Sequence, residues 1–352
     1  MDTAAGSAST TPPRSPSADD SGPPPAERAG DASDQEARPS RTGPRVPIAW
    51  WGLLVRAVVA LAILLGANLA AAAALTPLAL RFAPNSVPQG LLAVAMCALV
   101  CLGVVLLVGL WMRTVERRPL RAVLRPLDPD ETAAADAPAP RARRGARWAA
   151  AARGLAAGTL ASVVVMAVVL GIGALLLGDS PGSGADPDPG AAGAGGGAAP
   201  RTAAWLLVLV TVAQAYLLQG IPEEVLYRGW LFSVTRARPM VTLLWTTSAF
   251  TIIHLVSSGG QQSVLDFVLY LSIPLGFGAF AGALVLITGS MWVAAGVHGG
   301  FHIAAALAAV LLPAELSGSF GPADWVLTGS VYLAATALVL ALRSRGRQAR
   351  ER

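Results

Sequence analysis

The 352-residue chain is 54% hydrophobic, only 13% of its residues are charged, and its formal net charge at pH 7 is +5. An average soluble domain carries about 25% charged residues, so this composition argues against a soluble protein. The basic residues are all arginines and lie between long apolar runs, so membrane topology explains the positive charge better than nucleic-acid binding does.

The first 46 residues are rich in Pro, Ser, Ala and Asp and contain almost no large apolar side chains. Such a segment cannot bury enough apolar surface to offset the entropy lost on ordering, so we predict a disordered N-terminal tail. It is too long and too polar to be a signal peptide.

Eight apolar runs follow the tail, and each can cross a bilayer, for which about 17 to 25 apolar residues are needed. We place them near 53–80, 87–112, 154–177, 203–222, 241–257, 264–288, 291–312 and 325–342. The fourth is expected to continue as a helix to Phe232. The predicted fold is therefore all-α, a polytopic transmembrane helical bundle of about eight spans.

The arginines are distributed unevenly between the two sets of alternating loops. The loop 113–153 carries ten, the tail 343–352 carries five, and the turn after the fourth run carries Arg236 and Arg238. The loops without arginine are 178–200, 258–263 and 313–324. Because positive charge marks the cytoplasmic side, we predict cytoplasmic termini. The exclusive use of arginine with much Ala, Gly and Pro suggests a GC-rich bacterial genome, hence a bacterial inner membrane.

Ionisable side chains within the spans cost at least about 2.5 kcal/mol each at mid-span, so they persist where they pair or do chemistry. The candidates are Glu223, Glu224, Arg228, His254, His298 and His302. A single buried histidine is more often a core residue than a catalyst. Here all three histidines of the chain lie in apolar runs, which favours a functional site. Arg56 and Asp266 lie near span ends, where they are expected to snorkel or sit at the interface.

The acidic pair has informative spacing. Glu224 and Arg228 are one helical turn apart, in the order that favours an ion pair. Glu223 lies about 100° around the helix from Glu224, so it can point at the histidines instead. The alternative is that these three residues form a solvated cluster at the helix end.

Glu223 and His254 lie at equal distances from the Arg238–Pro239 turn, 15 or 16 residues on either side. In an antiparallel helical hairpin, equal residue counts mean equal depth, so we predict that the two side chains face each other. His298 and His302 are one turn apart. That spacing suits metal ligands and also suits hydrogen-bond donors to an oxyanion, and the sequence does not separate the two.

These residues carry a family resemblance. Residues 223–228 read Glu-Glu-x-x-x-Arg, residues 250–254 read Phe-x-x-x-His, and His298 opens a third motif. This order on successive apolar spans resembles the CPBP family (CAAX protease and bacteriocin-processing, also called Abi) of intramembrane glutamic endopeptidases. The family includes type II CAAX prenyl endopeptidases and lysostaphin resistance protein A-like proteins. The resemblance covers roughly residues 203–310.

The resemblance implies a role for each matching residue. Glu223 would activate the attacking water, and Glu224, held by Arg228, would shape the site. His254 would orient the water or carry a proton. The role implied for His298 is to hold the developing oxyanion. Four residues later the family usually has Asn, whereas this chain has His302, whose neutral imidazole can still donate one hydrogen bond.

Composition, the arginine distribution and the resemblance together predict how the chain is organised. Residues 47–200 would form N-terminal transmembrane helices, with the basic cytoplasmic loop 113–153 and the external Gly/Ala/Asp-rich loop 178–200, a flexible linker by composition. Residues 201–342 would form the catalytic membrane domain, and 343–352 a basic tail.

Several functions remain open at this stage. The first is a cofactor-free endopeptidase acting on an unknown membrane-associated peptide or protein, with membrane lipid as its other partner and no nucleic acid. The second is a protease that uses a divalent metal such as zinc, bound by Glu223, His254 and His298, with His302 as a fourth candidate ligand. The third is a non-catalytic immunity or scaffold protein. A proton-coupled transporter is weaker, because no inverted repeat is evident.

Overall fold

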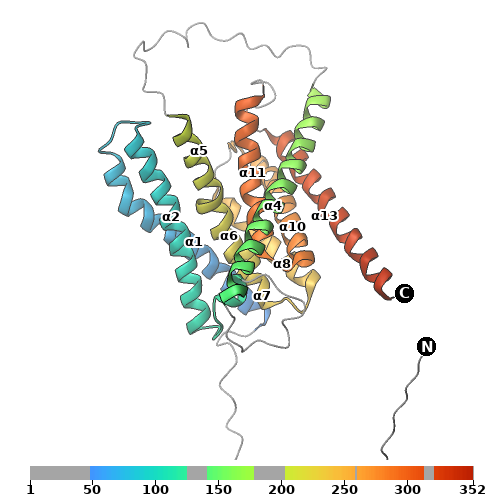
Figure 1. Ribbon diagram of the computed structural model, residues 1–352. Helices are drawn as coiled ribbons and strands as arrows, with labels where there is room; N and C mark the ends of the chain where they lie inside the picture. Colours follow the sequence, from blue (N-terminus) through green and yellow to red (C-terminus); the bar gives the residue numbers. More distant parts are fainter. Residues whose placement is uncertain (1–47, 125–140, 178–202, 258–259, 313–320, 352) are drawn as a thin grey trace, which may run out of the picture. The chain divides into compact units, whose positions relative to one another are not determined.

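The computed structural model describes residues 48–124, 141–177, 203–257, 260–312 and 321–351, which all belong to one unit of the chain. The predicted tail 1–46 and the loop 178–200 lie outside the described residues. All regular structure in the described residues is helical, and eight of their helices are long and apolar enough to span a membrane (Figure 1). The prediction of an all-α polytopic bundle is therefore confirmed.

Three long helices precede the fourth span. They are α1 (Trp50–Ala79), α2 (Val87–Thr114) and α4 (Arg141–Leu177), with the short α3 (Arg121–Leu124) between the last two. The fourth span combines α5 (Ala204–Ala213), η2 (Gln214–Gly220), α6 (Ile221–Glu224), η3 (Val225–Leu231) and α7 (Phe232–Val234). The remaining four contain α8 (Pro239–Ile253) with η4 (His254–Val256), α9 (Val264–Tyr270) with α10 (Ser272–Thr288), α11 (Met291–Leu311) and α13 (Pro322–Glu351).

Two helices are longer than predicted. The third span starts in a helix that begins at Arg141, within the expected basic loop, and α13 continues to Glu351, through most of the expected tail. Both extensions are rich in Ala and Arg, which are good helix formers. In α13 the arginines also lie near the helix C-terminus, where the helix dipole favours positive charge.

The fourth span is helical from Ala204 to Val234, which confirms the predicted continuation beyond the apolar run. Two π-helical stretches, η2 and η3, flank the short α6 that carries both glutamates. Pro222 has no backbone N–H, so the regular hydrogen-bond ladder is interrupted at this point. Such widened turns are rare and occur frequently at functional sites.

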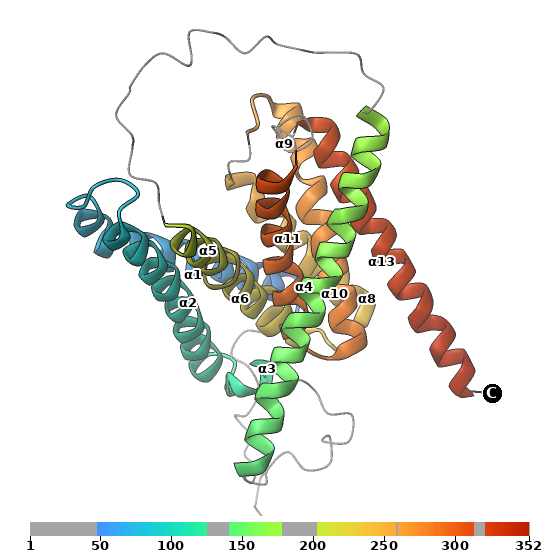
Figure 2. The ribbon, with the colours of Figure 1, turned by 45° about the horizontal axis from the view of Figure 1, so that its top comes forward.

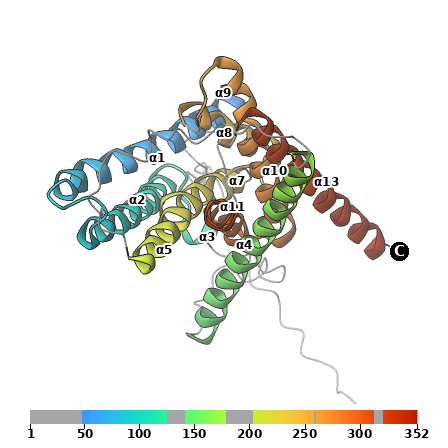
Figure 3. The same ribbon diagram turned by 90° about the horizontal axis from the view of Figure 1, so that it is seen from above.

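Helix α11 lies among α4, α10 and the fourth span when the bundle is seen from above (Figure 3). In an apolar 18-residue stretch of α11, 56% of the residues are buried inside the protein, a larger share than in the corresponding stretch of any other described span. Gly158 of α4 and Gly296 of α11 allow this packing, because a Cβ atom at either position would meet the backbone of the facing helix. The most enclosed helix is thus the one that carries His298 and His302.

The prediction that Arg56 snorkels was wrong, whereas its location near a membrane surface stays a prediction. Its side chain does not snorkel but is fully buried between α1 and the end of α2, where Nε and Nη2 donate to the two carboxylate oxygens of Glu116 at 2.7 and 3.0 Å. The physical reason is that a bidentate partner neutralises the charge inside the protein. Asp266 does lie at a span end, where it forms a capping box with Ser263 at the start of α9.

Candidate active site

A buried ion pair forms the base of the site. Arg228 Nη1 lies 3.3 Å from Oε1 of Glu224, and these residues are 2% and 0% exposed. Arg228 also donates from Nη2 to the Gly278 carbonyl at 2.8 Å, and its guanidinium lies 4.3 Å from the centre of the Phe250 ring. The predicted ion pair is therefore present, and the alternative of a solvated cluster is wrong.

His298 joins this pair from α11. Its Nδ1 lies 3.2 Å from Oε1 of Glu224, the same oxygen that Arg228 contacts. A carboxylate accepts hydrogen bonds, so Nδ1 of His298 carries the hydrogen of this contact. The arginine-bound glutamate thus also orients a histidine, a contact that the spacing of the motifs does not reveal.

The remaining two histidines are fixed in different ways. His254 Nδ1 lies 2.8 Å from the Phe250 carbonyl oxygen, which can only accept, so Nδ1 carries the hydrogen. In the neutral ring, Nε2 is then an acceptor. His302 stacks on His298 with ring centres 5.4 Å apart and an interplanar angle of 24°. Phe277 meets His298 edge-on, with ring centres 4.8 Å apart.

One cavity of about 290 Å³ brings four of the predicted site residues together. Its walls consist of Gln219, Glu223, Phe250, His254, Ser257, Tyr270, Ile273, Pro274, Phe277, His298, Phe301 and His302. Glu224 and Arg228 are not among these residues and lie behind the cavity wall. Glu223 and His254 were predicted to face each other, and both line this cavity.

Glu223 differs from Glu224 in its hydrogen bonding. The Oε2 atoms of both residues are buried without a hydrogen-bond partner among the described residues, but Oε1 of Glu224 contacts Arg228 and His298, whereas no such contact is made by Glu223. An unpaired buried carboxylate oxygen is costly, so it is a site where a water molecule or a substrate group would bind favourably. The two adjacent glutamates therefore occupy different environments, one facing the cavity and one held in an ion pair.

Three uncharged polar residues of the cavity were missed by the sequence analysis, namely Gln219, Ser257 and Tyr270. Gln219 has a signal that could have found it, because it precedes Glu223 by one helical turn. Ser257 and Tyr270 follow no motif, since their position depends on how the turn after η4 and the helix α9 fold over the site.

The described residues do not group as metal ligands. In the part of the chain that the structure describes, no three His, Cys, Asp or Glu side chains are arranged to hold one metal ion. We therefore derive no step through a metal.

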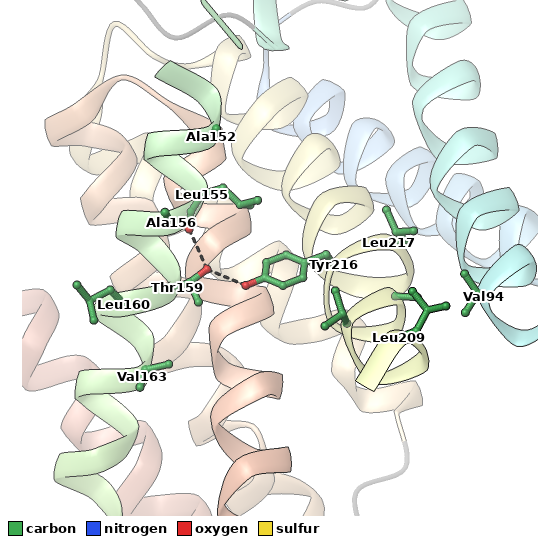
Figure 4. A pocket seen from close by; sticks show the side chains of 12 residues that line it. Val94, Ala152, Leu155, Ala156, Thr159, Leu160, Val163, Leu209, Tyr216 and Leu217 are labelled. Atoms are coloured by element: carbon green, nitrogen blue, oxygen red, sulfur yellow. Dashed lines mark hydrogen bonds between the residues drawn. The ribbon is translucent and has the colours of Figure 1, made fainter. Parts of the chain in front are cut away.

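A second, larger cavity of about 780 Å³ lies between α2, α4 and the first half of the fourth span. Its lining is apolar apart from Thr159 and Tyr216, whose hydroxyl oxygens are 2.7 Å apart (Figure 4). No acid, histidine or arginine lines it, so it offers no group for peptide-bond hydrolysis. Of these two cavities, only the smaller one is lined by acid and histidine side chains.

A family model matches the part of the chain that carries the site. Residues 203–304 match the family model described as type II CAAX prenyl endopeptidase Rce1-like. Searches of curated proteins and of solved structures found no match. The matched stretch begins just before α5, ends within α11, and includes all six predicted site residues. This multi-pass membrane protein thus contains, at residues 203–304, a region that is similar to the type II CAAX prenyl endopeptidase Rce1-like family, in agreement with the resemblance of its motifs.

Proposed function

We propose that the protein is an intramembrane endopeptidase in which Glu223 activates water for hydrolysis of a peptide bond. The observation that carries this proposal is the unpaired carboxylate oxygen of Glu223 in a cavity lined by three histidines. The family match of residues 203–304 supports a CAAX-type protease in general. A purely structural carboxylate would be expected to have a partner on at least one oxygen, as Glu224 has at Oε1, so the lack of any partner at Glu223 favours catalysis over a scaffold role.

In the proposed reaction, Glu223 takes a proton from a water molecule in the cavity, and the water oxygen attacks the carbonyl carbon of the substrate. The C–N bond of the tetrahedral intermediate then breaks, and the proton held by Glu223 passes to the leaving amine nitrogen. General-base catalysis of this kind contributes about 10²–10⁴-fold to the rate.

His254 is proposed to orient the water. Because Nδ1 donates to the Phe250 carbonyl, Nε2 of the neutral ring can accept a hydrogen bond from the attacking water. The water would then be held between two acceptors, Glu223 and His254, with a lone pair directed at the substrate carbonyl.

His298 and His302 are proposed to stabilise the oxyanion. This role requires a hydrogen on both ring nitrogens of His298, so that Nδ1 donates to Glu224 while Nε2 donates to the developing negative charge. Arg228 and Glu224 act indirectly, because they fix the orientation of His298 as the acid of a hydrolase triad fixes its histidine. His302 supplies a second donor from one turn further along α11.

The test has two stages, because the substrate is not known. Membrane peptides from cells with the wild-type protein and with Glu223→Gln are first compared by proteomics to find a peptide that the wild type cleaves. That peptide is then offered to both purified proteins in lipid vesicles. We expect cleavage to fall by at least about 10²-fold in Glu223→Gln. The control Asp266→Asn removes an acid that does not line the cavity. Intact cleavage by Glu223→Gln would contradict the proposal.

A non-enzymatic immunity or scaffold role gives a different result. It requires only that the polar cluster packs, so Glu223→Asp should support its activity in cells. For a general base, shortening the side chain by one methylene withdraws the carboxylate from the water, and cleavage should fall. The location proposed for the enzyme is a bacterial inner membrane, with both termini in the cytoplasm.

A further inference from the structure

The hydroxyl groups of Thr159 and Tyr216 form a pair that joins α4 to the fourth span. Thr159 Oγ1 donates to the backbone oxygen of Leu155 at 2.8 Å, one turn earlier in α4. Because this bond uses the single hydrogen of the Thr159 hydroxyl, Tyr216 is the donor in the 2.7 Å contact between the two hydroxyl oxygens (Figure 4). The other residues that line the surrounding cavity are apolar, so within that lining only Thr159 offers a side-chain acceptor to Tyr216.

The ring of Tyr216 also contacts α11, directly beside His298. A Cβ atom at Gly299 would overlap the Tyr216 ring, so the glycine provides the space that the ring occupies. Figure 2 shows α11 with α4 on one side and the fourth span on the other, and α11 packs against both. Tyr216 therefore contacts two neighbouring helices, one through its hydroxyl and one through its ring.

Helices α4 and α11 also touch each other at this point. A Cβ atom at Gly300 would lie 2.7 Å from the backbone oxygen of Thr159, and one at Gly296 would overlap the backbone of Leu155. Small residues allow membrane helices to approach this closely. The Thr159–Tyr216 hydroxyl pair thus completes a contact among three helices beside His298.

This contact lies on the side of α11 that faces away from the active site. At about 100° per residue, Gly299 and Gly300 are about 100° and 200° around the helix from His298. His298 itself points toward Glu224. Neither residue of the hydroxyl pair lines the catalytic cavity, so the pair can influence the site only through the position of α11.

The contact between His298 and Glu224 is sensitive to the position of α11. Its Nδ1–Oε1 distance of 3.2 Å lies at the long end of the usual range for such a hydrogen bond, about 2.7–3.2 Å. A small movement of α11 away from the fourth span would therefore weaken this contact, and the orientation of His298 depends on it.

We propose that Tyr216 is a positioning residue, whose ring and hydrogen bond to Thr159 hold α11 where His298 reaches Glu224. The effect on peptide cleavage rests on the proposed function, whereas the effect on the His298–Glu224 contact does not. A residue that only filled space would need the ring but not the hydroxyl, so removal of the hydroxyl separates the two roles.

The test removes each half of the hydroxyl pair. Tyr216→Phe keeps the ring but not the donor, and Thr159→Val keeps the shape but not the acceptor. Tyr332→Phe is the matched control, because the Tyr332 hydroxyl also lies at hydrogen-bond distance from α4, 2.6 Å from Ser162 Oγ, but joins α4 to α13. The chain has only three histidines, so ¹⁵N-histidine labelling reports on three rings, which are assigned by replacing each in turn.

Spectra of the labelled protein are recorded in lipid bilayers. We expect Tyr216→Phe and Thr159→Val to shift the Nδ1 signal of His298 in the direction of a weaker hydrogen bond. The shift should be no larger in the double variant, because both substitutions remove the same bond, and Tyr332→Phe should leave the signal in place. An unchanged His298 signal in Tyr216→Phe, or an equal shift in Tyr332→Phe, would overturn the proposal.

Cleavage of a peptide that requires Glu223 gives the second measurement. We expect kcat to fall by up to about 10²-fold in Tyr216→Phe and Thr159→Val with KM unchanged, because a misplaced catalytic group slows the reaction rather than binding. A wild-type kcat in spite of shifted His298 signals would contradict the positioning role. Shifted signals in a protein whose wild type shows no Glu223-dependent cleavage would contradict the proposed function and leave the support of α11 by Tyr216 in place.

Discussion

The backbone oxygen of Phe250 accepts a 2.8 Å hydrogen bond from Nδ1 of His254, one turn later in the same span. This bond gives the Phe-x-x-x-His spacing a physical meaning, because only a residue four positions earlier presents its carbonyl to the ring. The ring of Phe250 also packs against Arg228 and lies 4.7 Å from the imidazole of His254. One residue therefore fixes both the tautomer and the surroundings of the histidine.

A substitution that removes the Nε2 acceptor should stop the reaction. In His254→Leu, we expect the rate of peptide cleavage to fall by about 10²–10⁴-fold, since the water loses one of its two acceptors. Thermal unfolding in detergent should change little, because His254 is only partly buried. Phe250→Leu is the matched control, since it retains the carbonyl and should impair cleavage less. Equal rates for His254→Leu and the wild type would remove His254 from the mechanism.

The Glu224–Arg228 pair should matter for stability as well as for catalysis. Glu224→Gln leaves the Arg228 charge buried without its acid, and breaking a buried pair in this way costs about 3–5 kcal/mol. The double variant Glu224→Gln/Arg228→Gln removes both charges and should be less destabilised than the sum of the two single variants. Unfolding of the three variants in detergent measures this coupling. Additive losses would show that the two side chains do not interact.

Much of the membrane architecture follows from the sequence alone. The eight spans are visible as apolar runs, and the shared site of Glu223 and His254 follows from counting residues from the Arg238–Pro239 turn. What the sequence does not show is long-range pairing. Arg56 and Glu116 are 60 residues apart, and hydropathy alone does not show that Arg56 is buried against Glu116. Local periodicity carries no information on such a contact.

The second limit concerns the fourth span. A uniform helix predicts about 100° between Glu223 and Glu224, with only Glu223 near the histidines. The π-helical stretches on both sides of α6 change that geometry, and Glu224 reaches His298 as well as Arg228. Pro222, within an apolar run, is the feature of the sequence that could have indicated such a change.

The close approach of α10 to the ion pair gives a third prediction. A Cβ atom at Gly278 would lie 2.7 Å from Nη2 of Arg228 and 3.0 Å from the Phe250 ring, so Gly278→Ala should displace both side chains and lower cleavage. Gly66→Ala is the matched control, because nothing lies within 4 Å of its Cβ position and alanine favours the helix. Cleavage rates and unfolding temperatures of both variants test this difference. If Gly278→Ala cleaved as fast as Gly66→Ala, the contact with Arg228 would be unimportant.

The Arg56–Glu116 pair should stabilise the fold without taking part in the reaction. Neither residue lines the catalytic cavity, and both are buried. Glu116→Gln should lower the free energy of unfolding by about 3–5 kcal/mol, because the guanidinium of Arg56 is left with an uncharged partner. The cleavage rate per folded molecule should stay the same. Arg56→Lys keeps the charge but loses the two-bond geometry. Its free energy of unfolding should therefore lie between those of Glu116→Gln and the wild type. A lower rate per folded molecule would connect this pair with the active site.

Substitutions of His302 test the oxyanion proposal at the site residue where this chain differs from the family it resembles. The resemblance implies Asn at this position, and an amide donates hydrogen bonds much as an imidazole N–H does. We therefore expect His302→Asn to keep cleavage near the wild-type rate. His302→Ala removes the donor and should reduce the rate by about 10²–10³-fold. His302 also stacks on His298, so His302→Phe serves as the control that keeps an aromatic ring without any donor. If His302→Phe cleaved as well as His302→Asn, stacking alone would explain the histidine, and the oxyanion would depend on His298.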